Sequence, residues 1–184
     1  MSIRYGVATA DSDLDQILQL QQLNHTSTVN AWKAAQDGFV TVKHSFELLK
    51  QMNNAAPQII AKDGEHVIGY ALVMLKSFED MIPVLKPMFA RLSSISFGKR
   101  AITDHSFYIM GQICVAESYR GKGVFDALYL THKERNQSQF ELCVTSVSTR
   151  NQRSMRAHER VGFKVVNTFH DATDEWCILV WGWK

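Results

Sequence analysis

One stretch of the sequence restricts the fold more than any other: an apolar, strand-like run enters a basic turn with two glycines, and the turn opens a helix. The run occupies residues 107–115, the turn 120–123 reads Arg-Gly-Lys-Gly, and the helix follows from residue 124. Such a turn leaves unpaired backbone N–H groups at the positive end of a helix dipole, and glycine lets a ligand approach the main chain closely. The stretch therefore predicts an anion site suited to a phosphate or diphosphate, with an ordinary turn as the alternative.

The turn does not match two other well-known phosphate loops. It lacks the Gly-x-x-x-x-Gly-Lys-Ser/Thr pattern of a Walker loop. It also lacks the third glycine of the dinucleotide fingerprint, and Asp126 lies too near in sequence for a ribose contact. An oxidoreductase or nucleotide-binding protein, which would need its phosphate loop at the switch point of a parallel sheet, is therefore the weakest reading.

The whole chain reads as an alternation of short strands and helices without repeats or linkers. We expect strands at 3–8, 58–62, 65–76, 107–115, 140–147, 163–169 and 176–183, with Asp63-Gly64 as a hairpin turn. We expect helices from residue 11, at 45–52 (ending before Asn53), at 124–136 and at 151–161, with mixed signals at 24–44 and a long connection at 77–106. This order combines hairpins with crossover helices, so it predicts an α/β domain over residues 1–184 with a mixed sheet and helices on both faces.

Composition excludes several classes of partner. A formal net charge of +2 on 184 residues gives no case for a nucleic-acid or membrane surface. The amino terminus lacks the apolar core of a signal peptide, and no run is long enough to span a bilayer. Cys114, Cys143 and Cys177 are far apart, and the histidines show no metal-ligand spacing. We therefore expect buried, reduced thiols in a cytoplasmic protein, with no disulfide and no metal site.

Two motifs resemble those of a known family. Val115-x-x-x-Tyr119-Arg120-Gly121-Lys122-Gly123 resembles the acetyl-CoA diphosphate loop of the Gcn5-related N-acetyltransferases (GNATs), whose motif runs Arg/Gln-x-x-Gly-x-Gly/Ala. Asn151-x-x-Ser154-x-x-x-His158, which continues to Gly162-Phe163, resembles the second motif of that family. The Asp63-Gly64 hairpin followed by Val67-Ile68-Gly69-Tyr70 is also typical, and together these features cover most of residues 58–165.

The resemblance implies a GNAT-like acyl-CoA N-acyltransferase fold with a mostly antiparallel sheet of about seven strands. It further implies that strands 107–115 and 140–147 splay apart at a bulge, where acetyl-CoA enters. The pantetheine arm would pair with the backbone near Ile113, Cys114 and Val115. The diphosphate would rest on the amides of Arg120, Gly121, Lys122, Gly123, Val124 and Phe125, and Asn151 and Ser154 would face the pantetheine or a water near the thioester.

The sequence departs from the family at the positions that carry proton transfer. Acetyl transfer to an amine needs a neutral nucleophile, a polarised thioester carbonyl and a proton for the departing thiolate. The family often has a glutamate on the central strand as base and a tyrosine on the second-motif helix as acid; here the strand has Gly111 and Gln112, and the tyrosine position is His158. Gln112 is then a candidate to orient a water, and His158 the candidate acid, with a packing role for His158 as the alternative. A further departure is Phe125 at the position of the last Gly or Ala, where its side chain must turn away from the phosphates.

The helix of the second motif also has a basic side. Arg150, Arg153, Arg156 and Arg160 are expected opposite the face that holds Asn151, Ser154 and His158. A solvated helix face is the ordinary reading; the alternative is a collar for the 3′-phosphate of CoA or for an acidic acceptor. Nucleic-acid binding is disfavoured because no aromatic residues are interleaved.

These features predict an acetyl-CoA-dependent N-acetyltransferase that modifies a primary amine of an unidentified small molecule or protein by direct attack in a ternary complex. The apolar connection 77–106 is expected to shape the acceptor pocket. The alternative is an acyl-CoA-binding module with little transferase activity, which the missing carboxylates and Phe125 favour. The aromatic carboxyl-terminal run, with Trp181 and Trp183, predicts packing in the core or in a homodimer.

Overall fold

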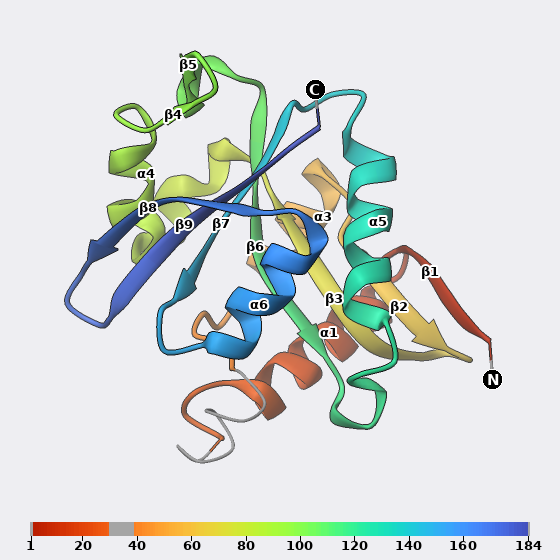
Figure 1. Ribbon diagram of the computed structural model, residues 1–184. Coiled ribbons are helices and arrows are strands. Elements are labelled where there is room, and N and C mark those ends of the chain that lie inside the picture. The colour runs from red at the N-terminus through yellow and green to blue at the C-terminus, as the bar shows by residue number, and fades with distance from the viewer. Residues whose placement is uncertain (1, 30–38, 184) are drawn as a thin grey trace.

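A seven-stranded sheet organises the residues that the computed structural model describes, 2–29 and 39–183 (Figure 1). The spatial order is β1-β2-β3-β6-β7-β9-β8, and every neighbouring pair is antiparallel except β6 with β7. The strands are Ile3–Val7 (β1), Ile59–Asp63 (β2), His66–Met74 (β3), Phe107–Val115 (β6), Leu142–Ser148 (β7), Lys164–His170 (β8) and Glu175–Gly182 (β9). A separate hairpin pairs Ser96–Phe97 (β4) with Arg100–Ala101 (β5). The mixed, mostly antiparallel sheet is thus confirmed.

Helices cover both faces of the sheet, as predicted. One hydrophobic cluster includes residues of Asp11–Asn24 (α1), Phe46–Ala55 (α3) and Lys86–Leu92 (α4), and the other includes residues of Val124–Asn136 (α5) and Gln152–Val161 (α6). Successive side chains of β3 alternate between the clusters, because neighbouring residues of a strand point to opposite faces. Within the described residues, no helix is both long and apolar enough to cross a membrane.

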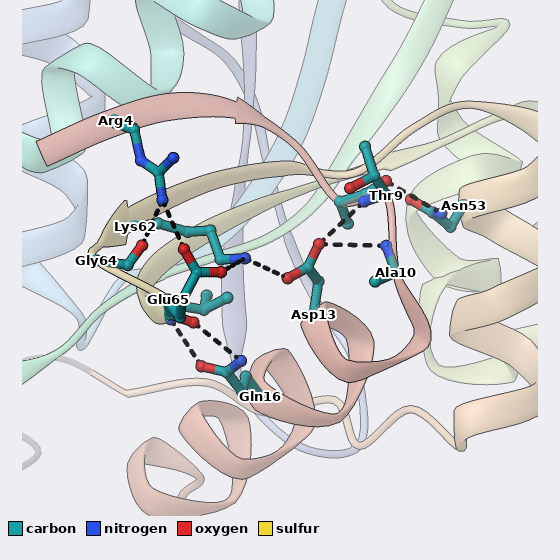
Figure 2. Close-up of polar contacts among 11 residues, drawn as sticks. Arg4, Thr9, Ala10, Asp13, Gln16, Asn53, Lys62, Gly64 and Glu65 are labelled. Atoms are coloured by element: carbon teal, nitrogen blue, oxygen red, sulfur yellow. Dashed lines mark hydrogen bonds and ion pairs between the residues drawn. The ribbon is translucent and has the colours of Figure 1, made fainter.

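The amino-terminal end of α1 is fastened to the β2–β3 hairpin (Figure 2). The buried Asp13 carboxylate accepts hydrogen bonds from the backbone N–H groups of Thr9 (3.0 Å) and Ala10 (3.3 Å), and it pairs with Lys62 at 2.7 Å. The amide of Gln16 bonds to the backbone of the hairpin. The start of α1, predicted at residue 11, is therefore attached to the hairpin by Asp13 and Gln16. This attachment also fixes the position of the other end of the helix.

One expected element boundary was wrong. The helix α3 continues through Asn53 and Asn54 to Ala55, because the Asn53 side chain finds partners outside the helix: its amide contacts the carbonyl of Ala8 and its oxygen accepts from Gln58 N–H. The long connection 77–106 contains 3₁₀ turns, α4 and the β4–β5 hairpin. The actual stop for α3 is Pro57, whose preceding residue is extended.

The carboxyl-terminal aromatic residues pack inside the molecule. Trp181 is buried, its ring lies 5.5 Å from that of Phe163, and Trp183 contacts both Trp181 (5.4 Å) and Tyr108 (5.8 Å). These contacts agree with the core alternative.

The two central strands diverge toward their carboxyl ends, and Figure 1 shows α6 lying across the end of β7. β6 pairs with β7 only at residues 107–109 against 142–144. Beyond that point β6 bulges, because Ala71 and Val73 of β3 face Ile113 and Met110. The divergence creates a gap next to the start of α5.

Candidate functional site

A cavity of about 490 Å³ lies where β6 leaves β7, bounded by the loop after β6, the first turn of α5 and α6. Its walls include every residue predicted from the sequence to hold the cofactor except Lys122: Ile113, Cys114, Val115, Arg120, Gly121, Gly123, Val124, Phe125, Asn151 and Ser154. Asn24 at the end of α1 and residues 39–40 close the remaining side. Residues from distant parts of the chain are thus brought to one hollow.

Backbone groups of β6 face this gap. Ala116 N–H donates to Ile68 O, which marks a hydrogen-bonded pair between β6 and β3. In an antiparallel ladder such pairs alternate, so Cys114 bonds to β3 whereas the amide and carbonyl groups of Ile113 and Val115 point away from it. Val115 O accepts from Arg120 Nε, so the backbone groups of Ile113 and the N–H of Val115 form the open edge along the cavity where β7 has already diverged. An extended ligand with amide groups of its own can pair with that edge.

The loop at the other end of the cavity exposes the start of α5. Gly121 (φ 74°) and Gly123 (φ 78°) are in the left-handed region, and an added Cβ at either position would meet no atom within 4 Å. The hydrogen bond from Ala127 N–H to Gly123 O begins the helix. The N–H groups at the start of α5 precede this bond and have no partner within the helix. Amides and helix dipole together make this end attractive to an anion.

Contacts with protein groups hold the charged side chains of the loop. Arg120 donates from Nε to Val115 O (3.0 Å) and from a terminal nitrogen to Asn24 Oδ1. Lys122 lies over the Tyr119 ring at 5.3 Å, and the Tyr119 hydroxyl donates to Asp63 (2.7 Å). Arg120 and Lys122 therefore tie the loop to α1 and to the β2–β3 hairpin, and Arg120 also lines the cavity; their expected contribution of charge stays a prediction.

Positive charge also reaches the cavity from α6. Arg153, Arg156 and Arg160 line it together with Ser154, so the expected separation into a cofactor face and an opposite basic face is wrong. The cavity faces the side of the helix that carries Ala157, between the two expected faces. Arg150 behaves differently, because it pairs with Asp174 at 2.7 Å outside the cavity.

His158 lies on the core side of the same helix. It is 1% exposed, its Nδ1–H donates to Ser154 O (2.8 Å), and its ring packs against those of Phe125, Tyr129 and Phe163. Burial lowers the pKa of His158 to about 4, so the ring is neutral near pH 7. These contacts favour the packing alternative over the role of an acid. The same cluster holds the ring of Phe125 5.2 Å from Tyr129.

Gln112 occupies the bulge of β6, and its side-chain oxygen is fully engaged by protein groups. Its Oε1 accepts from Gln21 Nε2 (2.7 Å) and from the Tyr70 hydroxyl (2.6 Å), and one N–H of its Nε2 donates to Val42 O (2.9 Å). The second N–H of Gln21 donates to Nδ1 of His44, because Gln21 Oε1 accepts from the backbone N–H of His44. Gln112 could therefore orient a water only as a donor, through the second N–H of its amide.

We call this group, Gln21, His44, Tyr70 and Gln112, the amide network. Sequence reasoning missed three of its members. Gln21 shares the buried face of α1 with two other polar residues, Asp13 and Asn24, so its place on that face did not single it out in the sequence.

A second, smaller cavity of about 70 Å³ adjoins the first and shares with it Phe39, Val40, Ile113, Asn151 and Ser154. It continues past Gln112 and His158 to β7 and Trp176. The connection 77–106 lines neither cavity: Met88 is buried in the core, whereas Met81 and Val84 are exposed. The connection instead lines a separate cavity of about 360 Å³ with Glu79, Asp80 and Phe89, and its expected role in shaping the acceptor pocket stays a prediction.

The three cysteines are buried and unpaired, as predicted. Cys114 borders the large cavity, but burial raises the pKa of its thiol to about 12. Among the described residues, no three His, Cys, Asp or Glu side chains group as a metal site requires.

The model of the acetyltransferase (GNAT) family matches residues 17–163. The chain therefore belongs to the GNAT family of acetyltransferases, as the two motifs indicated. No curated protein matches the sequence significantly.

Solved GNAT structures share the fold over nearly their whole length. Arabidopsis thaliana NAA60 in complex with acetyl-CoA is 16% identical, with a TM-score of 0.64 over 98% of this chain and 99% of that one. The yncA protein of Salmonella typhimurium with acetyl-CoA is 14% identical (TM-score 0.63; 99% and 94%). The ribosomal-protein-S18-alanine N-acetyltransferase of Escherichia coli is 11% identical (TM-score 0.64; 98% and 94%). At these identities the likeness concerns the fold.

Proposed function

We propose that the protein transfers the acetyl group of acetyl-CoA to a primary amine by direct attack in a ternary complex. The observation that carries the proposal is the large cavity, which has an open β-strand edge at one end and the exposed start of α5 at the other. This shape matches a ligand with an amide-containing arm and a diphosphate. Membership of the GNAT family supports acetyl transfer, and the solved relatives that bind acetyl-CoA support the choice of co-substrate.

In this proposal the pantetheine arm lies along β6 and pairs with the outward backbone groups of Ile113 and with the N–H of Val115, whose carbonyl is occupied by Arg120. The diphosphate accepts hydrogen bonds from the amides at 121–126, while the thioester lies where the two cavities meet, next to Asn151 and Ser154. The amine enters through the smaller cavity. The main contribution of the protein is then to hold amine and thioester in attack geometry.

The chemistry proceeds without a covalent enzyme intermediate. A neutral amine attacks the acetyl carbon, a C–N bond forms, the C–S bond breaks, the nitrogen loses its extra proton to water and the CoA thiolate takes one up. Cys114 is the nearest thiol of the described cavity wall, and with a pKa of about 12 it holds almost no thiolate at neutral pH. Direct transfer is thus favoured over relay through a cysteine.

Replacing Gly123 with valine tests the diphosphate assignment. The substitution forces a branched side chain into left-handed backbone beside the anion site, and we expect acetyl-CoA affinity measured by calorimetry to fall at least tenfold, about 1.4 kcal/mol. Gly98→Val is the matched control: Gly98 has a φ of 66°, an added Cβ there also meets nothing within 4 Å, and it lies in the β4–β5 hairpin. Equal affinity of both variants would refute the assignment.

A second candidate is an acyl-CoA-binding module with little transferase activity. Two observations favour it: Gln112 has no free acceptor site, and His158 is neutral and buried. Thiol release from acetyl-CoA across a panel of small amines and peptide amino termini separates the candidates. Saturable binding with no acceptor-dependent release would support the module, and release with any amine would support the enzyme.

We propose that the protein is located in the cytoplasm. Three unpaired, buried thiols fit a reducing compartment such as the cytoplasm.

A further inference from the structure

An acidic side chain stands on the wall where the diphosphate is proposed to bind. Asp126 is the third residue of α5 and is the only acidic residue among the described residues that line the large cavity. A carboxylate in the first turn stabilises a helix, because it faces the positive end of the dipole. A diphosphate bound at the start of α5 would interact with the same positive end of the dipole. The carboxylate and the diphosphate would then repel each other, because both are negatively charged.

Arg160 of α6 holds this carboxylate from the opposite wall. Its Nη2 donates to Asp126 Oδ1 (2.6 Å) and its Nε donates to Oδ2 (3.2 Å), so the guanidinium binds both carboxylate oxygens. Both side chains line the cavity and are about half exposed, at 57% for Arg160 and 43% for Asp126. The two hydrogen bonds fix the orientation of the carboxylate, and the positive guanidinium neutralises its charge.

We propose that Arg160 is a positioning residue for acetyl-CoA: it neutralises Asp126 and holds it aside, so that the diphosphate can reach the amides at the start of α5. The inference rests on the proposed function, since it concerns the same site. In this arrangement Arg160 acts through Asp126 and is not itself the phosphate ligand.

A double-mutant cycle tests the proposal, with acetyl-CoA as the probe and its dissociation constant measured by calorimetry. Arg160→Gln leaves an unneutralised carboxylate beside the diphosphate, and we expect affinity to fall about tenfold. Asp126→Asn removes the repulsion and should bind acetyl-CoA at least as tightly as the wild type. Adding Arg160→Gln to Asp126→Asn should then cost less than about threefold, because the charge that Arg160 neutralises is gone.

Arg150→Gln is the matched control. Arg150 makes a comparable ion pair with Asp174, 2.7 Å between Nη2 and Oδ2, but it does not line the cavity. We expect unchanged affinity for this variant. The unfolding midpoints of the Arg160 and Asp126 variants should change little, since exposed ion pairs contribute little stability. Arg150→Gln is compared by affinity alone, because the Asp174 side chain is only 10% exposed. Higher salt should shrink the difference between Arg160→Gln and the wild type, because exposed charges are screened.

The other outcomes would overturn the proposal in distinguishable ways. If the double variant binds as weakly as Arg160→Gln alone, then Arg160 contacts a phosphate directly and the neutralising role is wrong. If Arg160→Gln binds like the wild type, the pair has no part in binding. If the wild type itself does not bind acetyl-CoA, the proposed function fails and takes this inference with it.

Discussion

At the scale of single residues, His158 shows how its surroundings decide what a titratable group can do. The ring is enclosed by Phe125, Tyr129 and Phe163, and its one protonated nitrogen is committed to Ser154 O. With a pKa of about 4, the imidazolium form is nearly absent at neutral pH. The ring is therefore suited to fixing α6 and Ser154 beside the thioester, and poorly suited to donating a proton to the departing thiolate.

The pH dependence of turnover tests this assignment. Because His158 does not ionise between about pH 6 and 8, His158→Phe should leave the shape of the rate profile unchanged over that range, and any loss of rate should be the same at each pH. Phenylalanine suits the aromatic neighbours, so the variant should fold. A limb of the wild-type profile that disappears in the variant would show that His158 transfers a proton.

At the scale of elements, the amide network joins α1 and residues 42–44 to β3 and β6. Its members Gln21 (3% exposed) and Gln112 (7% exposed) are separated by 91 residues in sequence. Buried polar groups that lose their partners are costly, so the network holds residues 42–44 in one position. Since residues 39–42 line the smaller cavity, the network also fixes the wall of the proposed acceptor site.

Gln21→Leu should therefore destabilise the protein markedly. It removes the acceptor for His44 N–H and the donors for His44 Nδ1 and Gln112 Oε1, and we expect a loss of about 2–3 kcal/mol in the free energy of unfolding by urea titration. Gln22→Leu is the control on the same helix, because Gln22 bonds only to Thr28 at the surface, and it should cost less than about 0.5 kcal/mol. Similar losses in both variants would mean that the network is not specially stabilising.

Local signals in the sequence were sufficient for most elements and for ten of the residues that line the large cavity. The Asp63-Gly64 turn, with Gly64 at φ 59°, and the loop before α5 were both identifiable from residue type and spacing. What local signals could not supply were contacts between distant segments. Tertiary packing determines three features: the hydrogen bond from Arg120 to Asn24, the partners of Gln112 and the orientation of α6 toward the cavity. Helical periodicity and motif spacing carry no information about such packing.

At the scale of the whole molecule, three buried histidines make folding sensitive to acid. His44, His132 and His158 are at most 8% exposed, and burial lowers the pKa of each to about 4. In the unfolded chain the same groups titrate near about 6.5, so between pH 6.5 and 4 the unfolded state binds protons that the native state does not. Stability from these groups is complete above the unfolded pKa and is lost as the pH falls toward 4.

Urea unfolding at a series of pH values measures this effect. The free energy of unfolding should decrease with falling pH by up to about 1.4 kcal/mol per pH unit for each histidine, up to about 4 kcal/mol per unit for the three together. His132→Phe should flatten the slope by about one third. Stability that is constant from pH 6.5 to 4.5 would contradict the neutral, buried state of these residues.

The early end of the ladder between β6 and β7 has a mechanical consequence. β6 and β7 pair over only three residue pairs. A hydrogen bond from Thr145 Oγ1 to Met110 O and bonds from the N–H groups of Glu141 and Leu142 to Ser106 O also link the two half-sheets, β1-β2-β3-β6 and β7-β9-β8. With acetyl-CoA placed as proposed, its pantetheine arm occupies the place of the missing strand pairing between β6 and β7 and connects the two half-sheets. Relative motion of the two half-sheets would then be restricted while the co-substrate is bound and would increase after CoA has left. Each turnover would therefore pass through a more rigid and a more mobile form of the same fold.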